Sequence, residues 1–284
     1  MRVRDPLLGT RCEVEVRGAS PEAVDAAELR VLAEVERLES VFTLFDDASD
    51  IHALRRSGET TSVELSDVWK LAHLWYHRTG GVFHPGLQPL VDLWTRAAEL
   101  DRVPGEATRT EAVAALDASG HRHLDFNALA KGWIADRGLD SAFTDADVSS
   151  SWLSLGGDLV HRGERSVAVG IQDPTRPYDN VAPLATIDIS NEALATSGTV
   201  HRYWTIDGER YSRVLDPRTG APVDHIRSAT VVAPTAATAD VLATAALILA
   251  PDETVELAAS QDADCLLITA ASEVVQTTDR FRRA

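Results

Sequence analysis

A carboxylate and a hydroxyl stand four residues apart in the last fifth of the chain, at Asp240 and Thr244. The alanine- and leucine-rich sequence around them predicts a helix over residues 239–249. Side chains four residues apart share one face of a helix, so both oxygens would point the same way. Such oxygens suit a hard cation such as Mg²⁺. A helix cap beside a partly buried threonine has the same pattern, and spacing alone leaves both interpretations open.

A lysine and two glycine-containing segments could hold a phosphate group. Lys131 is expected at the start of a helix, where free main-chain N–H groups and an ammonium act together on an anion. Residues 156–157 and 197–198 contain glycines that would let main-chain N–H groups approach a ligand closely. Each signal is weak alone, because most lysines are solvated and most Gly-Gly pairs are turns.

Short motifs occur in a fixed order along the chain. They are Leu-Gly-Thr at 8–10, Thr-Gly-Gly-Val-Phe-His-Pro at 79–85, Leu-Asp-Phe-Asn-Ala-Leu-Ala-Lys-Gly at 124–132, Leu-Gly-Gly-Asp at 155–158, Gly-Ile-Gln-Asp-Pro at 170–174, Thr-Ser-Gly at 196–198, Leu-Asp-Pro-Arg-Thr-Gly at 215–220, and the segment from Ala239 to Leu247. In this order they resemble the ApbE family, the Mg²⁺-dependent FAD:protein FMN transferases. The resemblance extends from about residue 7 to about residue 250.

The resemblance implies two closely packed lobes of a T-fold type with the ligand cleft between them. It assigns Mg²⁺ to the side chains of Asp240 and Thr244 and to the main-chain carbonyl of Ala128. An oxygen-only set of this kind suits Mg²⁺ and does not suit zinc. It places FAD against a longer set of residues, namely Leu8, Phe45, Val82, Phe83, His84, Asp125, Lys131 and Val214.

Three residues depart from the family pattern. His84 stands where the family usually has a carboxylate, Asn127 where glycine is frequent, and Arg213 where histidine is usual. Arginine stays protonated and cannot act as a base, although it can clamp a phosphate with two hydrogen bonds. We expect Arg213 and Asp216 to take part in catalysis. A base, if one is required, would come from the following group: His84, His201, His225 or Asp216.

The expected activity is the transfer of FMN from FAD to a threonine hydroxyl of an acceptor flavoprotein, with release of AMP. The resemblance implies that the acceptor has an FMN-binding domain with a short Ser/Asp-Gly-Ala/Ser-Thr type segment. Water as the acceptor would instead make the protein an FAD pyrophosphatase that yields FMN and AMP. Arg213 and His84 favour a third possibility, a non-catalytic FAD-binding protein. Asp240, Thr244 and Lys131 argue against it, because a binder needs no phosphate-activating metal.

Composition limits the other possibilities. The 284 residues include 27 Lys and Arg against 44 Asp and Glu, so the formal net charge is −17. This charge argues against nucleic acid as a partner. The sequence has no apolar signal region and no membrane-length apolar run, so we expect a cytoplasmic protein without membrane insertion. Cys12 and Cys265 are expected as reduced core residues.

The elements that position these groups can also be predicted. Ser20 and Pro21 mark the start of a long helix, and Ser66 is expected to cap another that ends at Gly80. Further helices are expected at 51–56, 129–143, 239–249 and 252–260. Strands are expected at 9–17, 152–155, 167–171, 184–189, 202–206, 210–215, 230–232 and 266–269.

Tight turns between these strands decide the fold class. Asp207-Gly208 predicts a hairpin, and hairpins indicate mainly antiparallel sheets. We therefore predict an α+β protein with helices flanking the sheets. Residues 1–284 are expected to form one domain, with a possible lobe boundary near residues 101–110, where Pro104 and Gly105 interrupt a polar segment.

Overall fold

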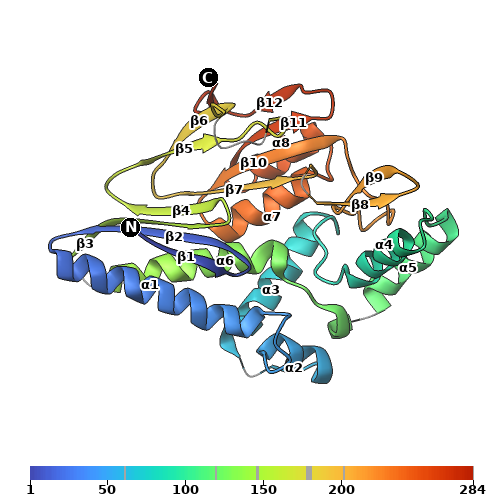
Figure 1. The fold of residues 1–284 in the computed structure, drawn as a ribbon, viewed down its shortest axis with the longest axis horizontal. Helices are drawn as coiled ribbons and strands as arrows, with labels where there is room; N and C mark the ends of the chain where they lie inside the picture. The colour runs from blue at the N-terminus through green and yellow to red at the C-terminus, as the bar shows by residue number, and fades with distance from the viewer. Residues whose placement is uncertain (61, 119, 145–146, 177–180, 201, 284) are drawn as a thin grey trace.

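A large antiparallel sheet forms the centre of the molecule (Figure 1). The computed structural model describes residues 1–60, 62–118, 120–144, 147–176, 181–200 and 202–283. Within these ranges the sheet has the order β1-β2-β3-β4-β7-β10-β11-β12. Its strands are β1 Arg2–Leu7, β2 Thr10–Gly18, β3 Val148–Leu155, β4 Asp158–Gly163, β7 Ala193–Gly198, β10 Ile226–Ala233, β11 Asp264–Thr269 and β12 Val274–Gln276.

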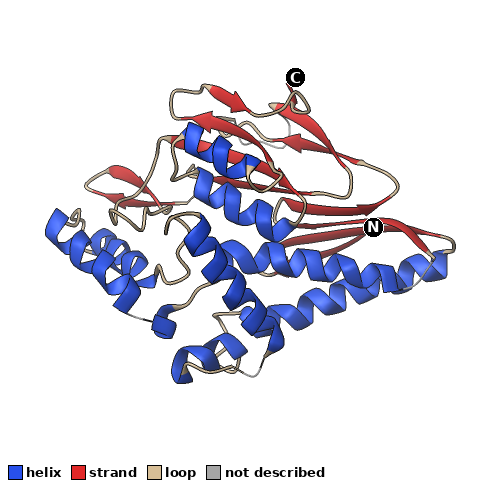
Figure 2. Cartoon of the chain, turned by 180° about the vertical axis from the view of Figure 1, so that it is seen from behind, coloured by secondary structure: helices blue, strands red, loops and turns tan. Residues whose placement is uncertain are grey.

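Helices gather on one side of this sheet (Figure 2). They are α1 Pro21–Phe42, α2 Asp50–Ser57, α3 Val63–Arg78, α4 Gln88–Glu99, α5 Glu106–Ala118, α6 Asn127–Asp140, α7 Ala236–Ala246 and α8 Pro251–Ala259. The apolar faces of α1, α2, α3, α6, α7 and α8 bury the main core against the inward side chains of the strands, whereas α4 and α5 belong to a separate apolar cluster. Cys12 and Cys265 are buried there as free thiols, and burial raises their pKa values to about 12 and about 11. The predicted α+β class with mainly antiparallel sheets is confirmed.

Capping residues fix the helix starts. Ser20 caps α1 by accepting a hydrogen bond from the N–H of Ala23, as the sequence predicts. The prediction that Ser66 caps α3 is wrong, because Ser62 takes that role through the N–H of Leu65. Ser62 lies four residues before Ser66, so α3 begins about one helical turn earlier than predicted.

A smaller sheet covers the opposite face of the large one. It has the order β13-β6-β5, formed by Arg282–Arg283, Ala185–Ile189 and Val167–Ile171. Its apolar side chains pack against those of β4, β7, β10 and β11. This arrangement makes β5 an edge strand whose outer side has no strand neighbour in the described ranges.

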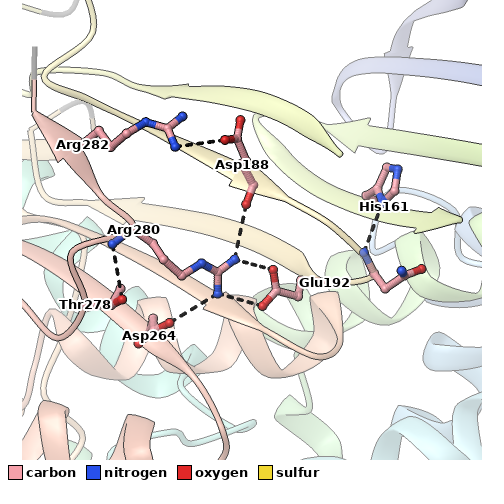
Figure 3. A network of polar contacts seen from close by, with 8 residues as sticks. His161, Asp188, Glu192, Asp264, Thr278, Arg280 and Arg282 are labelled. Carbon is pink, nitrogen blue, oxygen red and sulfur yellow. Dashed lines mark hydrogen bonds and ion pairs between the residues drawn. The ribbon is translucent and has the colours of Figure 1, made fainter. Parts of the chain in front are cut away.

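Charged groups tie the small sheet to the rest of the molecule (Figure 3). The Arg280 guanidinium donates to both carboxylate oxygens of Glu192 at 2.5 and 2.9 Å. It also lies 3.5 Å from an oxygen of Asp264 in β11. Arg282 donates to Asp188 of β6 at 2.9 Å. These contacts fix β6 and the C-terminal segment on the large sheet.

A hairpin and two helices form a projecting unit. The hairpin consists of β8, Tyr203–Ile206, and β9, Glu209–Ser212. Asp207 and Gly208 both have positive φ angles, which confirms the predicted tight turn. Apolar side chains of the hairpin pack on α4 and α5, including Trp204 against Trp94. Residues 101–105 form the turn between α4 and α5, and a lobe boundary in this region stays a prediction.

Every helix in the described ranges is too short or too polar to cross a membrane.

Candidate active site

A cleft of about 490 Å³ opens where the start of α6, α7, the end of β7 and the segment after β9 meet. Ten of the predicted site residues line it: Val82, Phe83, His84, Asp125, Ala128, Lys131, Arg213, Val214, Asp240 and Thr244. These residues come from separate parts of the sequence. The fold therefore brings together most of the side chains that the sequence singled out.

The two helices that supply the polar groups lie in very close contact, side by side under the large sheet (Figure 1). Gly132 of α6 faces the first turn of α7, and a Cβ atom at this position would lie 2.3 Å from the carbonyl oxygen of Ala236. The Asp136 carboxylate accepts hydrogen bonds from the N–H groups of Ala236 and Ala237 at 2.9 and 3.0 Å. Asp136 thereby binds the N-terminus of α7, which holds Asp240 in a fixed position relative to α6.

Lys131 lies between two buried carboxylates. Its Nζ forms an ion pair with Asp158 and lies 3.5 Å from Oδ2 of Asp240. Only 3% of Asp158 and 4% of Asp240 is exposed to solvent. Asp158 also accepts a hydrogen bond from the N–H of Thr196 at 3.2 Å. If all three groups are ionised, this cluster carries a net charge of one minus.

The polar groups around this cluster fit Mg²⁺. In the part of the chain that the structure describes, no three His, Cys, Asp or Glu side chains are placed to hold a metal ion. Magnesium, however, is commonly bound by one or two carboxylates together with substrate phosphates. The carboxylates of Asp158 and Asp240 and the hydroxyl of Thr244, which is 3.3 Å from that of Ser197, offer oxygen atoms only.

Ala128, whose main-chain carbonyl is the third predicted ligand, also lines the cleft. Gly132 stands four residues later in α6, so its N–H group is the regular helical partner of this carbonyl. The same N–H group lies 3.3 Å from Oδ2 of Asp240 and donates to it. Sharing the donor weakens the bond to Ala128, which leaves its carbonyl oxygen better able to bind a cation.

Asp125 places a further carboxylate in the cleft, two residues before the start of α6. Its Oδ1 accepts from the N–H of Asn127 at 2.8 Å, and its own N–H donates to the carbonyl of Pro85. Burial raises the pKa of Asp125 above its ordinary value, and the Asn127 N–H group and the Arg55 guanidinium oppose the rise. These two hydrogen bonds hold Asp125 between the loop after α3 and the start of α6, where its carboxylate can accept further hydrogen bonds.

Two arginines line the cleft from the two ends of the projecting hairpin, one before β8 and one after β9. Arg213 and Arg202 both line it, and the N–H of Arg213 donates to the carbonyl of Arg202 at 3.0 Å. The Arg213 guanidinium lies 5.2 Å from the ring centre of Trp204, which restricts its position. Together with Lys131 they provide three cations in a cleft of a protein whose net charge is strongly negative.

His84 is the only imidazole that lines the cleft among the described residues. Its Nδ1 accepts from the N–H of Gly86 at 3.0 Å. In the neutral ring the proton therefore lies on Nε2, which makes His84 a donor at that atom rather than a base.

Four predicted residues lie elsewhere. Leu8 occupies the β1–β2 turn, where its N–H donates to Glu39, and Phe45 is fully exposed in the loop after α1. Asp216 is buried in the turn of residues 215–220, where its carboxylate binds the guanidinium of Arg218 at 2.9 Å. His225 is bonded to the carbonyl of Leu249. Roles for these residues stay predictions, and His201 lies outside the described residues.

The sequence did not identify the roles of Asp158, Asp136 and Arg202. Asp158 belongs to the glycine motif at 155–158, which identifies the segment but not the ion pair of its last residue with Lys131. Asp136 and Arg202 belong to no motif in the sequence. Asp136 binds the N-terminus of α7, which lies 100 residues later in the chain, and Arg202 lines a cleft whose other residues come from distant segments.

The chain matches the ApbE family over residues 8–267 and belongs to this family. It is 27% identical over 300 residues to an FAD:protein FMN transferase of Klebsiella pneumoniae, covering 95% of this chain and 84% of that relative. It is 28% identical over 281 residues to an FAD:protein FMN transferase of Treponema pallidum, covering 86% and 77%. The ApbE protein of Thermotoga maritima has the same fold, with a TM-score of 0.83, 24% identity and full coverage of both chains. The predicted family is confirmed.

Proposed function

We propose that this protein transfers FMN from FAD to a threonine hydroxyl of an acceptor flavoprotein and releases AMP. The observation that carries the proposal is the polar cluster of Lys131, Asp158, Asp240 and Thr244 in a cleft that also contains Arg213. A pyrophosphate linkage requires cations on its oxygens, and this cleft concentrates them in an otherwise acidic protein. The names of the ApbE relatives, FAD:protein FMN transferase, support the transfer of FMN from FAD to a protein.

The proposed Mg²⁺ would be held by Asp240, Thr244 and the carbonyl of Ala128, with Asp158 beside them. Bound there, the cation would neutralise charge on phosphate oxygens. Lys131, in the first half of α6, would bind a further phosphate oxygen with its ammonium group, near the positive end of the helix dipole. Arg213 and Arg202 would hold the nucleotide from the opposite wall of the cleft.

The reaction exchanges one phosphorus–oxygen bond for another. The acceptor hydroxyl oxygen bonds to the phosphorus atom of the FMN half, and the bond from this phosphorus to the bridging oxygen breaks. AMP leaves with the bridging oxygen. The proton of the acceptor hydroxyl is transferred either to solvent or to the phosphate of AMP. No oxidation or reduction takes place, and the product is a phosphodiester between FMN and threonine.

Arg213 in place of the usual histidine is compatible with this reaction. Phosphoryl transfer generally has a loose transition state in which the nucleophile contributes little bonding, so early removal of its proton is not required. Positioning and charge stabilisation then supply most of the rate. A fixed guanidinium supports these two tasks, which favours turnover over mere binding of FAD.

The test is incubation of the protein with FAD, Mg²⁺ and a purified FMN-binding-domain acceptor, followed by intact-mass analysis and nucleotide chromatography. The expected result is an acceptor heavier by one FMN, and AMP in solution. An acceptor whose target threonine is replaced by valine is the control and should gain no mass. Free FMN with unlabelled acceptor would instead show a pyrophosphatase, and unchanged FAD would show a binding protein.

A further inference from the structure

A second groove continues from the cleft around the end of the large sheet. Its volume is about 300 Å³, and its walls include the Gly156-Gly157 turn, residues 169–172 and the end of β7. Residues Gly156, Thr196, Ser197 and Gly198 line both the groove and the cleft. The two spaces therefore meet at the residues next to Thr244, whose hydroxyl lies 3.3 Å from that of Ser197.

The groove exists because β7 extends beyond its neighbour. β10 pairs with β7 along the whole length Ala193–Gly198. On the other side, β4 pairs with β7 only at Leu194 and Ala193, because β4 begins at Asp158. The last three residues of β7 thus have a strand partner on one side and face the Gly156-Gly157 turn on the other.

Main-chain groups of this overhanging end point into the groove. The N–H of Thr199 donates to the carbonyl of Arg227 in β10, whereas the N–H of Thr196 points the other way and donates to the carboxylate of Asp158. Main-chain groups alternate in direction along a strand, so those of Gly198 face the same side as those of Thr196. The opposite wall is β5, an edge strand that also presents main-chain groups on its outer side.

We propose that this groove binds the acceptor protein as an extended segment that adds to these strand edges. The inference rests on the proposed function and names where its protein substrate docks. Main-chain hydrogen bonds to β5 and to the end of β7 would hold the segment. Its hydroxyl side chain then enters the cleft at Ser197. Gly157 keeps its part of the wall open, because nothing lies within 4 Å of the place where a Cβ atom would stand, so that another main chain can approach closely.

The geometry also separates the two substrates. FAD would occupy the cleft on the helical side of the sheet, and the acceptor would arrive from the side of the small sheet. The ion pairs of Arg280 and Arg282 hold the small sheet in place, so the β5 wall is a fixed one. Groove residues outside the cleft should therefore affect the acceptor and leave FAD binding unchanged.

The experiment compares the parent with Val200→Trp and Gln172→Trp, two exposed groove residues that do not line the cleft. Val103→Trp is the matched control, because Val103 is 38% exposed and Val200 37%, and Val103 lies in the distant α4–α5 turn. Acceptor labelling at saturating FAD and the dissociation constant for FAD are both measured. We expect a kcat/KM for the acceptor that is lower by about tenfold or more in the groove variants. FAD affinity should be unchanged, and the control should equal the parent.

A second measurement tests main-chain pairing directly. Peptides that carry the acceptor segment are N-methylated at one position at a time and used as inhibitors of labelling. Inhibition should be lost when the methyl group is placed at every second position, because the N–H groups of an extended segment alternate in direction. Groove variants that label the acceptor as fast as the parent, or inhibition that shows no alternation, would overturn the docking site while the transferase activity stands. A parent protein that labels no acceptor would overturn the proposed function, and the docking site with it.

Discussion

Lys131 Nζ lies 3.5 Å from Oδ2 of Asp240, so the protein itself provides a cation beside the carboxylate that we assign to Mg²⁺. The same ammonium forms an ion pair with Asp158. One lysine thus serves two buried carboxylates, and their remaining negative charge favours a further cation. Removal of the lysine should therefore change both the stability of the protein and its response to a metal ion.

Lys131→Met should destabilise the protein and make its stability depend on Mg²⁺. The substitution leaves Asp158 and Asp240 without their counter-charge, which we expect to cost about 2 kcal/mol because Lys131 is partly exposed. Thermal unfolding with and without Mg²⁺ measures the effect. The metal should raise the Tm of the variant more than that of the parent. Equal Tm shifts in both proteins would show that Lys131 does not neutralise the two carboxylates. The control is Lys70→Met, because Lys70 is an exposed lysine that also forms an ion pair.

Asp240→Asn should abolish Mg²⁺-dependent release of AMP while the fold is retained. The amide can still accept from the N–H of Gly132 but carries no charge for a cation. A loss of about a hundredfold or more is expected, as for removal of other single electrostatic stabilisers. Asp252→Asn, an exposed carboxylate of α8, should leave the rate unchanged. Normal rates in Asp240→Asn would remove this residue from the metal assignment.

Gly132→Ala should force α6 and α7 apart. The added Cβ would lie 2.3 Å from the carbonyl oxygen of Ala236, and main-chain atoms there cannot rotate away. Overpacking of this kind costs about 1–3 kcal/mol, and it should displace Lys131 from Asp240. Chemical unfolding and FAD titration would measure both effects. Gly105→Ala is the control, since open space surrounds that position. A Gly132→Ala protein with the stability and FAD affinity of the parent would show that the two helices can adjust.

Asp125→Asn should change how stability depends on pH. Burial raises the folded-state pKa of Asp125 above its unfolded value, so its contribution is fully present below the unfolded pKa and lost as the pH rises through the folded pKa. The variant should therefore gain stability relative to the parent as the pH rises from about 4 towards neutrality. Urea unfolding at several pH values measures this. A constant difference across the range would show that Asp125 titrates normally.

Arg213→His restores the residue that is usual in the family, and we expect no increase in kcat. A base contributes little to a loose transition state, and the lost guanidinium should instead raise the KM for FAD about tenfold or more. Steady-state kinetics with varied FAD separates the two parameters. A higher kcat in the variant would mean that proton removal limits the parent protein.

Local signals in the sequence predicted much of the fold. The serine–proline start of α1 and the Asp207-Gly208 turn depend only on neighbouring residues, and both are confirmed. β1, β4 and β7 were not predicted as strands, although each pairs with a neighbour in the large sheet. α7 begins at Ala236 rather than near Asp240, because Thr235 caps it.

For the candidate site too, local motifs could be recognised in the sequence, whereas contacts between distant segments could not. Motif order indicated ten residues that the fold gathers in one cleft. The ion pair of Lys131 with Asp158 could not be predicted, because it joins α6 to the start of β4, and no local pattern relates the two. Phe45 shows the converse, because the family resemblance assigned it to the flavin site, whereas its side chain is fully exposed and does not line the cleft.

The most direct test of the central claim is the ratio of AMP released to acceptor labelled, measured in one reaction with FAD and Mg²⁺. Our account predicts one AMP for each FMN bound to the acceptor threonine, and neither product with Asp240→Asn. Release of AMP without labelling of the acceptor, at any acceptor concentration, would contradict it.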